Sequence, residues 1–219
     1  MEVQVKTNQG ADAGTLDIAD SVWDVKMNQP VLHQVIVAQQ ANKRQGGADT
    51  KNRGDIIASG RKLHAQKGGG RARLGPRSSP SQVGGAVAHG PHPKSYRLRV
   101  PVKMRRLALK VALSEQLRKG KVTFVDKLSV AEPSTSELSK SLEAIRVDHR
   151  SLVVTSGDNS TLVLSARNLE GITIQSADLI NPLDIYGARQ IIFTRAAAER
   201  VDEIWATTGK SSVAAGAGA

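Results

Sequence analysis

Five histidines are the residues of this chain best suited to catalysis or metal binding, and two of them share a short motif. His89 and His92 lie three residues apart in HGPHP, where the prolines favour an extended backbone over a helix. No cysteine and no adjacent carboxylate completes a ligand set, since the chain has no cysteine at all. That absence also excludes thiolate nucleophiles and disulfides. We therefore expect no metal site. The remaining histidines are isolated: His33, His64 and His149.

The glycine run 68–70 is the second feature that could support ligand chemistry. A phosphate-binding loop needs GxxxxGK followed by Ser or Thr, whereas Gly70 is followed by Arg71 and Ala72. The turn 156–159, after a predicted strand, could hold a nucleotide but lacks a second glycine. The motifs GxSxG and HExxH and paired catalytic carboxylates do not occur. The alternative of a nucleotide-using enzyme with a basic insertion rests on fold class alone, so we expect neither an enzyme nor a cofactor.

Positive charge is the chemistry that the chain has in excess, and it is confined to one segment. The formal net charge is +11. Residues 41–121 contain 20 Lys and Arg but three acids, whereas the rest of the chain contains 11 basic and 17 acidic residues. This imbalance predicts a polyanionic partner, either nucleic acid or an acidic membrane surface. No stretch approaches the ~18 apolar residues of a membrane span, and the N-terminus is polar, so we expect a soluble, cytoplasmic protein with no membrane partner.

The middle of the stretch 41–121 has a composition that cannot form a hydrophobic core. Residues 46–93 hold 11 of the 20 glycines, four of the eight prolines and no aromatic residue. Such a loop is usually functional or disordered, and the alternative is a flexible linker between two domains. Arginine binds phosphate oxygens with two hydrogen bonds, and glycine lets the backbone approach RNA closely. Because the loop has no aromatic residues for base stacking, we expect it to bind a crevice of folded RNA and to become ordered there.

The elements that position this loop follow from hydrophobic spacing and from helix start and stop signals. We expect strands at 3–6, 15–18, 121–126, 151–155, 172–175 and 190–194, and helices at 30–44, 102–119, 134–145, 160–168, 182–185 and 196–206. Alternating strands and helices predict an α/β fold with a single, mainly parallel sheet and helices on its faces, Rossmann-like but without a dinucleotide motif. The expected organisation is a globular α/β domain (1–45 and 98–206), an extended basic RNA-binding loop (46–97) between two helices, and a disordered tail (207–219).

Two further patterns concern individual helices. Ser134 and Glu137 have the spacing of a capping box, which predicts the start of a helix. Lys103, Arg106 and Lys110 follow one another on one face of the helix at 102–119. This basic stripe is either a solvated helix face or part of the same RNA footprint, and its position next to the basic loop favours RNA.

Several stretches of the chain resemble the bacterial ribosomal protein L-four family. They are LHQVIVAQQANKRQG, TKNRGDIIASGRK, QKGGGRARLG, SPSQVGGAVAHGPHPKSY and PVKMRRLALKVALSE, followed downstream by VDKLSV, PSTSEL and SARNLEG. The resemblance extends over roughly residues 6–205. The block QKGGGRARLG is specific because it occurs together with LHQV upstream and the basic helix downstream.

The resemblance implies a structural constituent of the large ribosomal subunit that binds its RNA early in assembly. It implies that the loop threads into the RNA core and that its tip lines the nascent-peptide exit tunnel opposite large-subunit protein L-twenty-two. The implied partners are large-subunit ribosomal RNA, neighbouring ribosomal proteins and the passing nascent peptide, without homo-oligomers. By motif match the tunnel-lining tip is Gln66, Lys67, Gly68, Gly69, Gly70 and Arg71. The expected ribosomal RNA contacts are Lys43, Arg44, Lys51, Arg53, Arg61, Lys62, Lys67, Arg71, Arg73, Arg77, Lys94, Arg97, Arg99, Lys103, Arg106 and Lys110.

The chain departs from the family pattern at two places near the tip. An aromatic residue often precedes the QKG block, whereas here the chain reads Leu63–His64–Ala65, and Gly69 stands where threonine is common. In the family, changes at positions matching Gln66, Lys67 and Gly70 alter the response to macrolide antibiotics. The alternative function is a free RNA-binding regulator or RNA chaperone with a disordered basic arm, and some relatives bind messenger RNA.

Overall fold

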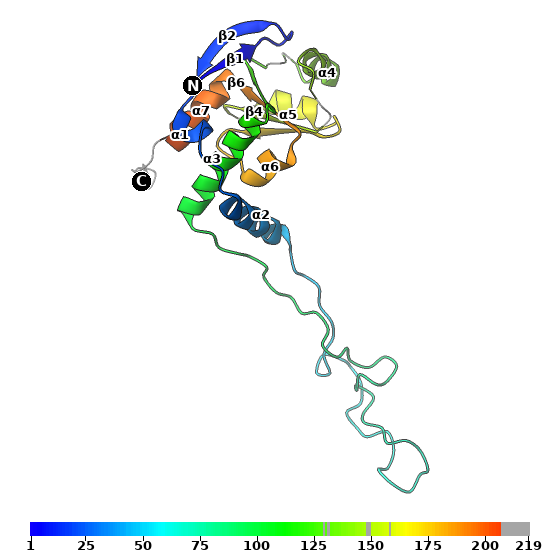
Figure 1. Cartoon of the computed structure of the whole chain (residues 1–219). Helices are drawn as coiled ribbons and strands as arrows, with labels where there is room; N and C mark the ends of the chain where they lie inside the picture. The colour runs from blue at the N-terminus through cyan, green and yellow to red at the C-terminus, as the bar shows by residue number, and fades with distance from the viewer. Residues whose placement is uncertain (129, 131, 148–149, 158, 207–219) are drawn as a thin grey trace, which may run out of the picture. The chain divides into compact units, whose positions relative to one another are not determined.

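The computed structural model describes residues 1–128, 130, 132–147, 150–157 and 159–206. These residues form two compact units, which are considered separately (Figure 1). One unit, the α/β unit, comprises residues 1–39 and the described residues from Arg99 onward. The other, called here the basic segment, comprises residues 40–98. The expected disordered tail at 207–219 lies outside the described residues.

Six strands of the α/β unit form one sheet in the order β2-β1-β3-β6-β4-β5. They are β1 (Glu2–Lys6), β2 (Asp12–Asp17), β3 (Val122–Val125), β4 (Ser151–Thr155), β5 (Ile172–Ser176) and β6 (Gln190–Thr194). The β1–β2 hairpin is antiparallel, and the pairings β1–β3, β3–β6, β6–β4 and β4–β5 are parallel. The prediction of an α/β fold is confirmed.

The helices lie close to their predicted positions, with one addition. They are α1 (Asp20–Trp23), α2 (Gln29–Lys43), α3 (Val102–Arg118), α4 (Thr135–Ala144), α5 (Ser160–Ala166), α6 (Pro182–Gly187) and α7 (Arg195–Ala206). The prediction missed α1, because four residues are too few to show helical periodicity. Hydrophobic spacing correctly indicated the core face of α2, where Leu32 and Val35 are buried.

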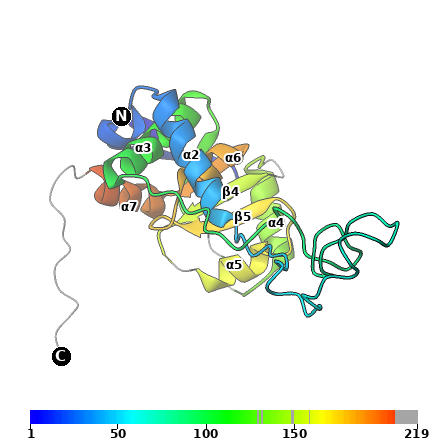
Figure 2. The ribbon, with the colours of Figure 1, turned by 90° about the horizontal axis from the view of Figure 1, so that it is seen from below.

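The sheet separates two hydrophobic clusters, because alternate side chains of each strand point to opposite faces. On β3, Phe124 belongs to the larger cluster, which α1, α2, α3, α6 and α7 help to form. The next residue, Val125, belongs to the smaller cluster, which includes residues of α4 and α5. Figure 2 shows α4 and α5 on one side of the sheet and α2 and α3 on the other. Both faces are therefore covered, as a parallel sheet requires.

Three aromatic rings form the centre of the larger cluster. The ring centroid of Trp23 lies 5.6 Å from that of Phe124 and 5.2 Å from that of Phe193, both in edge-on arrangements. The carboxylate of Asp202 on α7 accepts hydrogen bonds from the Trp23 Nε1 (2.7 Å) and from the backbone N–H of Ala19 (2.9 Å). The side chain of Asp202 thus anchors α1, the helix that sequence did not predict, to α7.

The capping box predicted at α4 forms only in part. The Ser134 hydroxyl accepts a hydrogen bond from the Glu137 N–H at 3.4 Å, as expected. The Ser134 N–H, however, donates to the hydroxyl of Ser165 on α5 (3.0 Å) rather than to the Glu137 side chain. The neighbouring helix supplies the acceptor because α4 and α5 pack together over the same sheet face.

Candidate RNA interface

The basic segment contains twelve Lys and Arg residues, and all of them are exposed. Its acidic residues are two, Asp49 and Asp55. Asp49 contacts the ring of His92 at 3.0 Å, and Asp55 accepts a hydrogen bond from the Asn52 N–H. Among the residues that the structure describes, no Lys or Arg of the segment forms an ion pair. The segment therefore presents uncompensated positive charge to solvent.

Hydrogen bonds connect the two limbs of the basic segment near its ends. The side-chain amide of Asn42 accepts from the Leu98 N–H (2.7 Å) and donates to the Leu98 carbonyl (3.3 Å). Further along, the Lys94 N–H donates to the Gly46 carbonyl, and the Thr50 hydroxyl donates to the Pro91 carbonyl. The Val87 N–H donates to the Lys51 carbonyl. The limbs consequently run side by side over this stretch (Figure 1).

The part of the segment that holds the expected tip is closed by a second group of contacts. An isolated antiparallel bridge joins Lys62 to Pro76. The imidazole Nε2 of His64 lies 2.9 Å from the Ala72 carbonyl, and the ammonium group of Lys62 donates to the Gln66 side chain. These contacts enclose the stretch 65–71, where Gly70 has a φ of 63° in open space. The six expected tip residues, 66–71, therefore lie together, and all are exposed.

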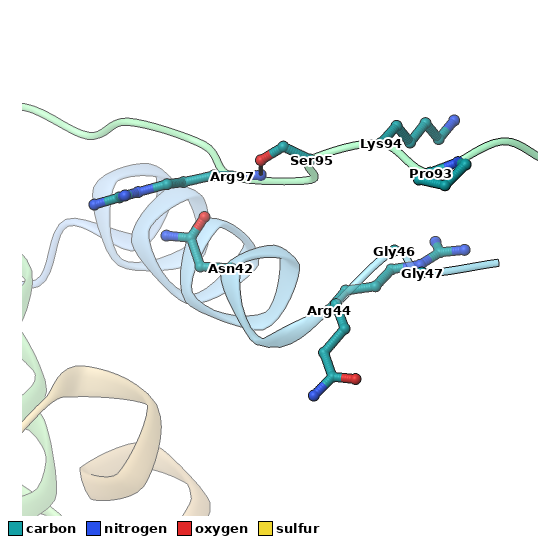
Figure 3. A pocket seen from close by; sticks show the side chains of 9 residues that line it. Asn42, Arg44, Gly46, Gly47, Pro93, Lys94, Ser95 and Arg97 are labelled. Carbon is teal, nitrogen blue, oxygen red and sulfur yellow. Dashed lines mark hydrogen bonds between the residues drawn. The ribbon is translucent and has the colours of Figure 1, made fainter. Parts of the chain in front are cut away.

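A cavity of about 780 Å³, called here the root notch, lies between the limb that leaves α2 and the returning limb at residues 93–97 (Figure 3). Its lining includes the basic side chains of Arg44, Lys94 and Arg97 and the backbone of Gly46 and Gly47, but no acidic residue. This arrangement brings together three of the expected RNA-binding residues from opposite limbs.

The basic stripe on α3 belongs to the α/β unit. Lys103 and Arg106 are exposed and Lys110 is half-buried. In the part of the chain that the structure describes, none of the three forms an ion pair, whereas Arg118 near the end of the helix pairs with Asp24 at 2.8 Å. Burial, together with the nearby charge of Arg106, lowers the pKa of Lys110 below its ordinary value. An anion at this stripe would favour the charged form of Lys110.

The other sequence candidates do not form a recognisable ligand site. The turn after β4 borders a cavity of about 420 Å³, but its lining mixes Lys127 and Arg195 with Asp126 and Glu199. Within the described ranges, no three His, Cys, Asp or Glu side chains come close enough to hold a metal ion. His149 lies outside these ranges. No described helix is both long and apolar enough to cross a membrane.

Sequence reasoning missed the residues that give the basic segment its internal contacts. Tyr96 is one of them, because its ring lies 3.9 Å from the guanidinium carbon of Arg44 and 5.1 Å from the ammonium nitrogen of Lys94. Asn42 is another, through its paired hydrogen bonds with Leu98. The tyrosine gave a usable signal, since it is the one aromatic residue within 40–98 and lies among basic residues.

Comparison with known proteins places this architecture in a family. A family model described as Ribosomal protein L4/L1 family matches residues 16–204. The chain belongs to the ribosomal protein L4/L1 family. A protein of Brevibacillus brevis named large ribosomal subunit protein uL4 is 40% identical over 205 residues, which cover 94% of this chain and 99% of the relative. Proteins of the same name from Dehalococcoides mccartyi and Symbiobacterium thermophilum are each 37% identical, over 205 and 203 residues, and the matches cover 98% of each relative.

Membership of the L4/L1 family confirms the resemblance found in the sequence. The family consists of structural ribosomal proteins rather than enzymes, so the expectation that this chain is not an enzyme is confirmed as well. The match begins within β2 and ends in α7, and therefore includes the whole basic segment. The segment is thus part of the family's architecture and not an insertion peculiar to this chain.

Proposed function

We propose that this L4/L1-family chain is a structural protein of the large ribosomal subunit that binds large-subunit ribosomal RNA through its basic segment. The observation that carries the proposal is the set of twelve exposed Lys and Arg residues without an ion-pair partner among the described residues. Cations of this kind displace counterions from RNA phosphates, and the released ions favour binding. The α/β unit keeps its own core and does not depend on the segment for it.

The finer assignment follows the family. In this assignment the chain consists of a Rossmann-like globular domain (1–45 and 98–206) and an extended RNA-binding loop (46–97), and the loop reaches the RNA core of the subunit. The RNA contacts are the basic residues of the segment, together with Arg99, Lys103, Arg106 and Lys110. The tip 66–71 lines the nascent-peptide exit tunnel near large-subunit protein L22. The exposure of these residues, apart from the half-buried Lys110, and the closure of the tip by Lys62 and His64 support this assignment.

The test is a sucrose gradient of cell lysate, run at low and then at high salt and probed for this chain. We expect it to sediment with the large subunit and to stay there after the high-salt wash, because a segment enclosed by folded RNA cannot exchange freely. Release to the top of the gradient as salt rises would overturn the proposal. That result would instead favour a free RNA-binding regulator or RNA chaperone that holds its RNA from outside.

A further inference from the structure

Close backbone packing and a shared tyrosine ring hold the two limbs of the basic segment together at the root notch. The geometry points to a phosphate-binding site there, which takes the phosphodiester backbone of a single RNA strand independently of the tip. This inference rests on the proposed function, since it names a separate contact within the RNA-binding segment. Its supporting features are a closely packed glycine, a ring that orients two cations, and a lining free of acids.

Gly46 fixes the distance between the two limbs at the notch. Its φ of 69° lies in the left-handed region, which favours glycine. A Cβ at this position would overlap the carbonyl oxygen of Lys94 and press against the ring of Tyr96, at 3.0 Å. At the neighbouring Gly47 an added Cβ would meet nothing within 4 Å. The backbone at Gly47 is therefore open to a ligand, while that at Gly46 is held by the opposite limb.

Tyr96 orients the cations of the notch. The guanidinium carbon of Arg44 lies 3.9 Å from the centre of the ring, which is stacking distance, and the Lys94 ammonium nitrogen lies 5.1 Å from it. Figure 3 shows the Arg44 side chain extending toward the limb that carries Lys94. A guanidinium stacked on a ring still has its N–H groups directed outward in its own plane, where they can bind a phosphate with two hydrogen bonds. The ring thus reduces the conformational freedom that Arg44 would lose on binding.

Charge at the notch favours an anion over other ligands. The nearest acid in sequence, Asp49, is engaged with His92 and with the Thr50 N–H, and it does not line the cavity. The competing explanation for the cations is the C-terminus of α2, whose unpaired carbonyl groups attract basic residues such as Lys43 and Arg44. That explanation does not account for Lys94 and Arg97 on the opposite limb, or for the stacking on Tyr96.

The experiment follows the notch directly by nuclear magnetic resonance of the full-length chain. A short oligouridine is titrated into labelled protein, and the amide signal of Gly47 and the side-chain Nε signal of Arg44 report on the notch, while the amide of Gly70 reports on the tip. A methylphosphonate version of the same oligomer, which lacks backbone charge, is the ligand control. Two matched pairs of variants complete the design: Gly46→Ala with Gly54→Ala, a glycine of the same segment that lies outside the notch lining and has open space for a Cβ, and Tyr96→Ala with Tyr96→Phe.

We expect oligouridine to shift the Gly47 and Arg44 signals and the neutral oligomer to leave them unmoved. Gly46→Ala and Tyr96→Ala should raise the RNA concentration for half-maximal shift of Arg44 by about tenfold, the effect of losing one charge-assisted hydrogen bond. The partner variants Gly54→Ala and Tyr96→Phe should keep the wild-type value, and circular dichroism should show all four folded. Unmoved notch signals while Gly70 shifts would overturn the inference and leave the proposed function intact. Equal shifts with the neutral oligomer would overturn it too.

Discussion

Deleting residues Gly54–Pro91 should leave the α/β unit folded while removing most of its affinity for RNA. Of the deleted residues, only Ser78 and Ala86 are buried, and neither belongs to a core cluster. The contacts of Asn42 with Leu98 and of Gly46 with Lys94 lie outside the deletion and keep the shortened limbs together. The contact of Asp49 with His92 is also retained. After the deletion, the four residues 50–53 connect these two positions and reverse the direction of the chain.

The expected change in stability follows from the length of the loop. The deletion shortens the basic segment roughly threefold, which lowers the entropic cost of loop closure by about 1 kcal/mol. The lost hydrogen bonds of Thr50 and Lys51 are on the solvent-facing segment and offset little of this gain. For a domain of this size, 1 kcal/mol corresponds to a rise in Tm of about 2–4 °C. The deletion also removes six Lys and Arg residues, so the slope of log affinity against log salt should fall by about 4 to 5.

Two assays measure these effects on the same pair of proteins. Thermal unfolding followed by circular dichroism gives Tm, and filter binding of large-subunit ribosomal RNA at several salt concentrations gives the slope. Loss of the helical signal, or a lower Tm than that of the intact chain, would refute the separation of core and binding segment. An unchanged salt slope would refute the placement of the RNA contacts.

Three single substitutions test other parts of the structure. Asp202→Ala leaves the buried Trp23 Nε1–H and the backbone N–H of Ala19 without their acceptor, so urea unfolding should show a free energy of unfolding lower by about 3 kcal/mol. Glu199→Ala on the same helix should change this free energy very little. Lys110→Met should weaken RNA binding in the filter assay. The pKa of Lys110 is lower in the folded chain than its ordinary 10.5, so the free energy of unfolding should rise as pH increases through that lowered pKa toward 10.5. Lys110→Met should flatten this rise. The same pH dependence of unfolding in both proteins would contradict the shift. Lys67→Glu should alter erythromycin sensitivity without changing Tm, and an unchanged inhibitory concentration in ribosomes that contain the variant would exclude its place at the tip.

Local patterns in the sequence predicted the elements of the fold but not their order in space. Leu32 and Val35 indicated α2 through their spacing, and KVTFVD indicated β3 through its β-branched residues. The position of β6 between β3 and β4 could not be predicted, because it results from packing between segments distant in the chain. The short α1 was missed for a related reason, since its stability comes from Trp23 in the core rather than from its own four residues.

In the candidate site, too, local properties were predictable from the sequence and contacts between distant residues were not. Charge and composition predicted which segment presents uncompensated positive charge to solvent, because those properties are visible residue by residue. The pairing of its limbs was not predictable, since Asn42 and Leu98 are 56 residues apart and Asp49 and His92 are 43 apart. The role of Tyr96 likewise depends on Arg44 from the other limb. Contacts of this kind carry no local periodicity, so only the structure gives them.

The pairing of β1 with β3 sets the order of events while the chain is being made. Val5 pairs with Phe124, so β1 cannot join its parallel neighbour until more than a hundred further residues have been synthesised. At about 5–20 residues per second this interval is on the order of ten seconds. The basic segment lies wholly within the interval and leaves the synthesising ribosome before the sheet can close. Each new chain therefore exposes its basic segment before the sheet of the α/β unit can form completely.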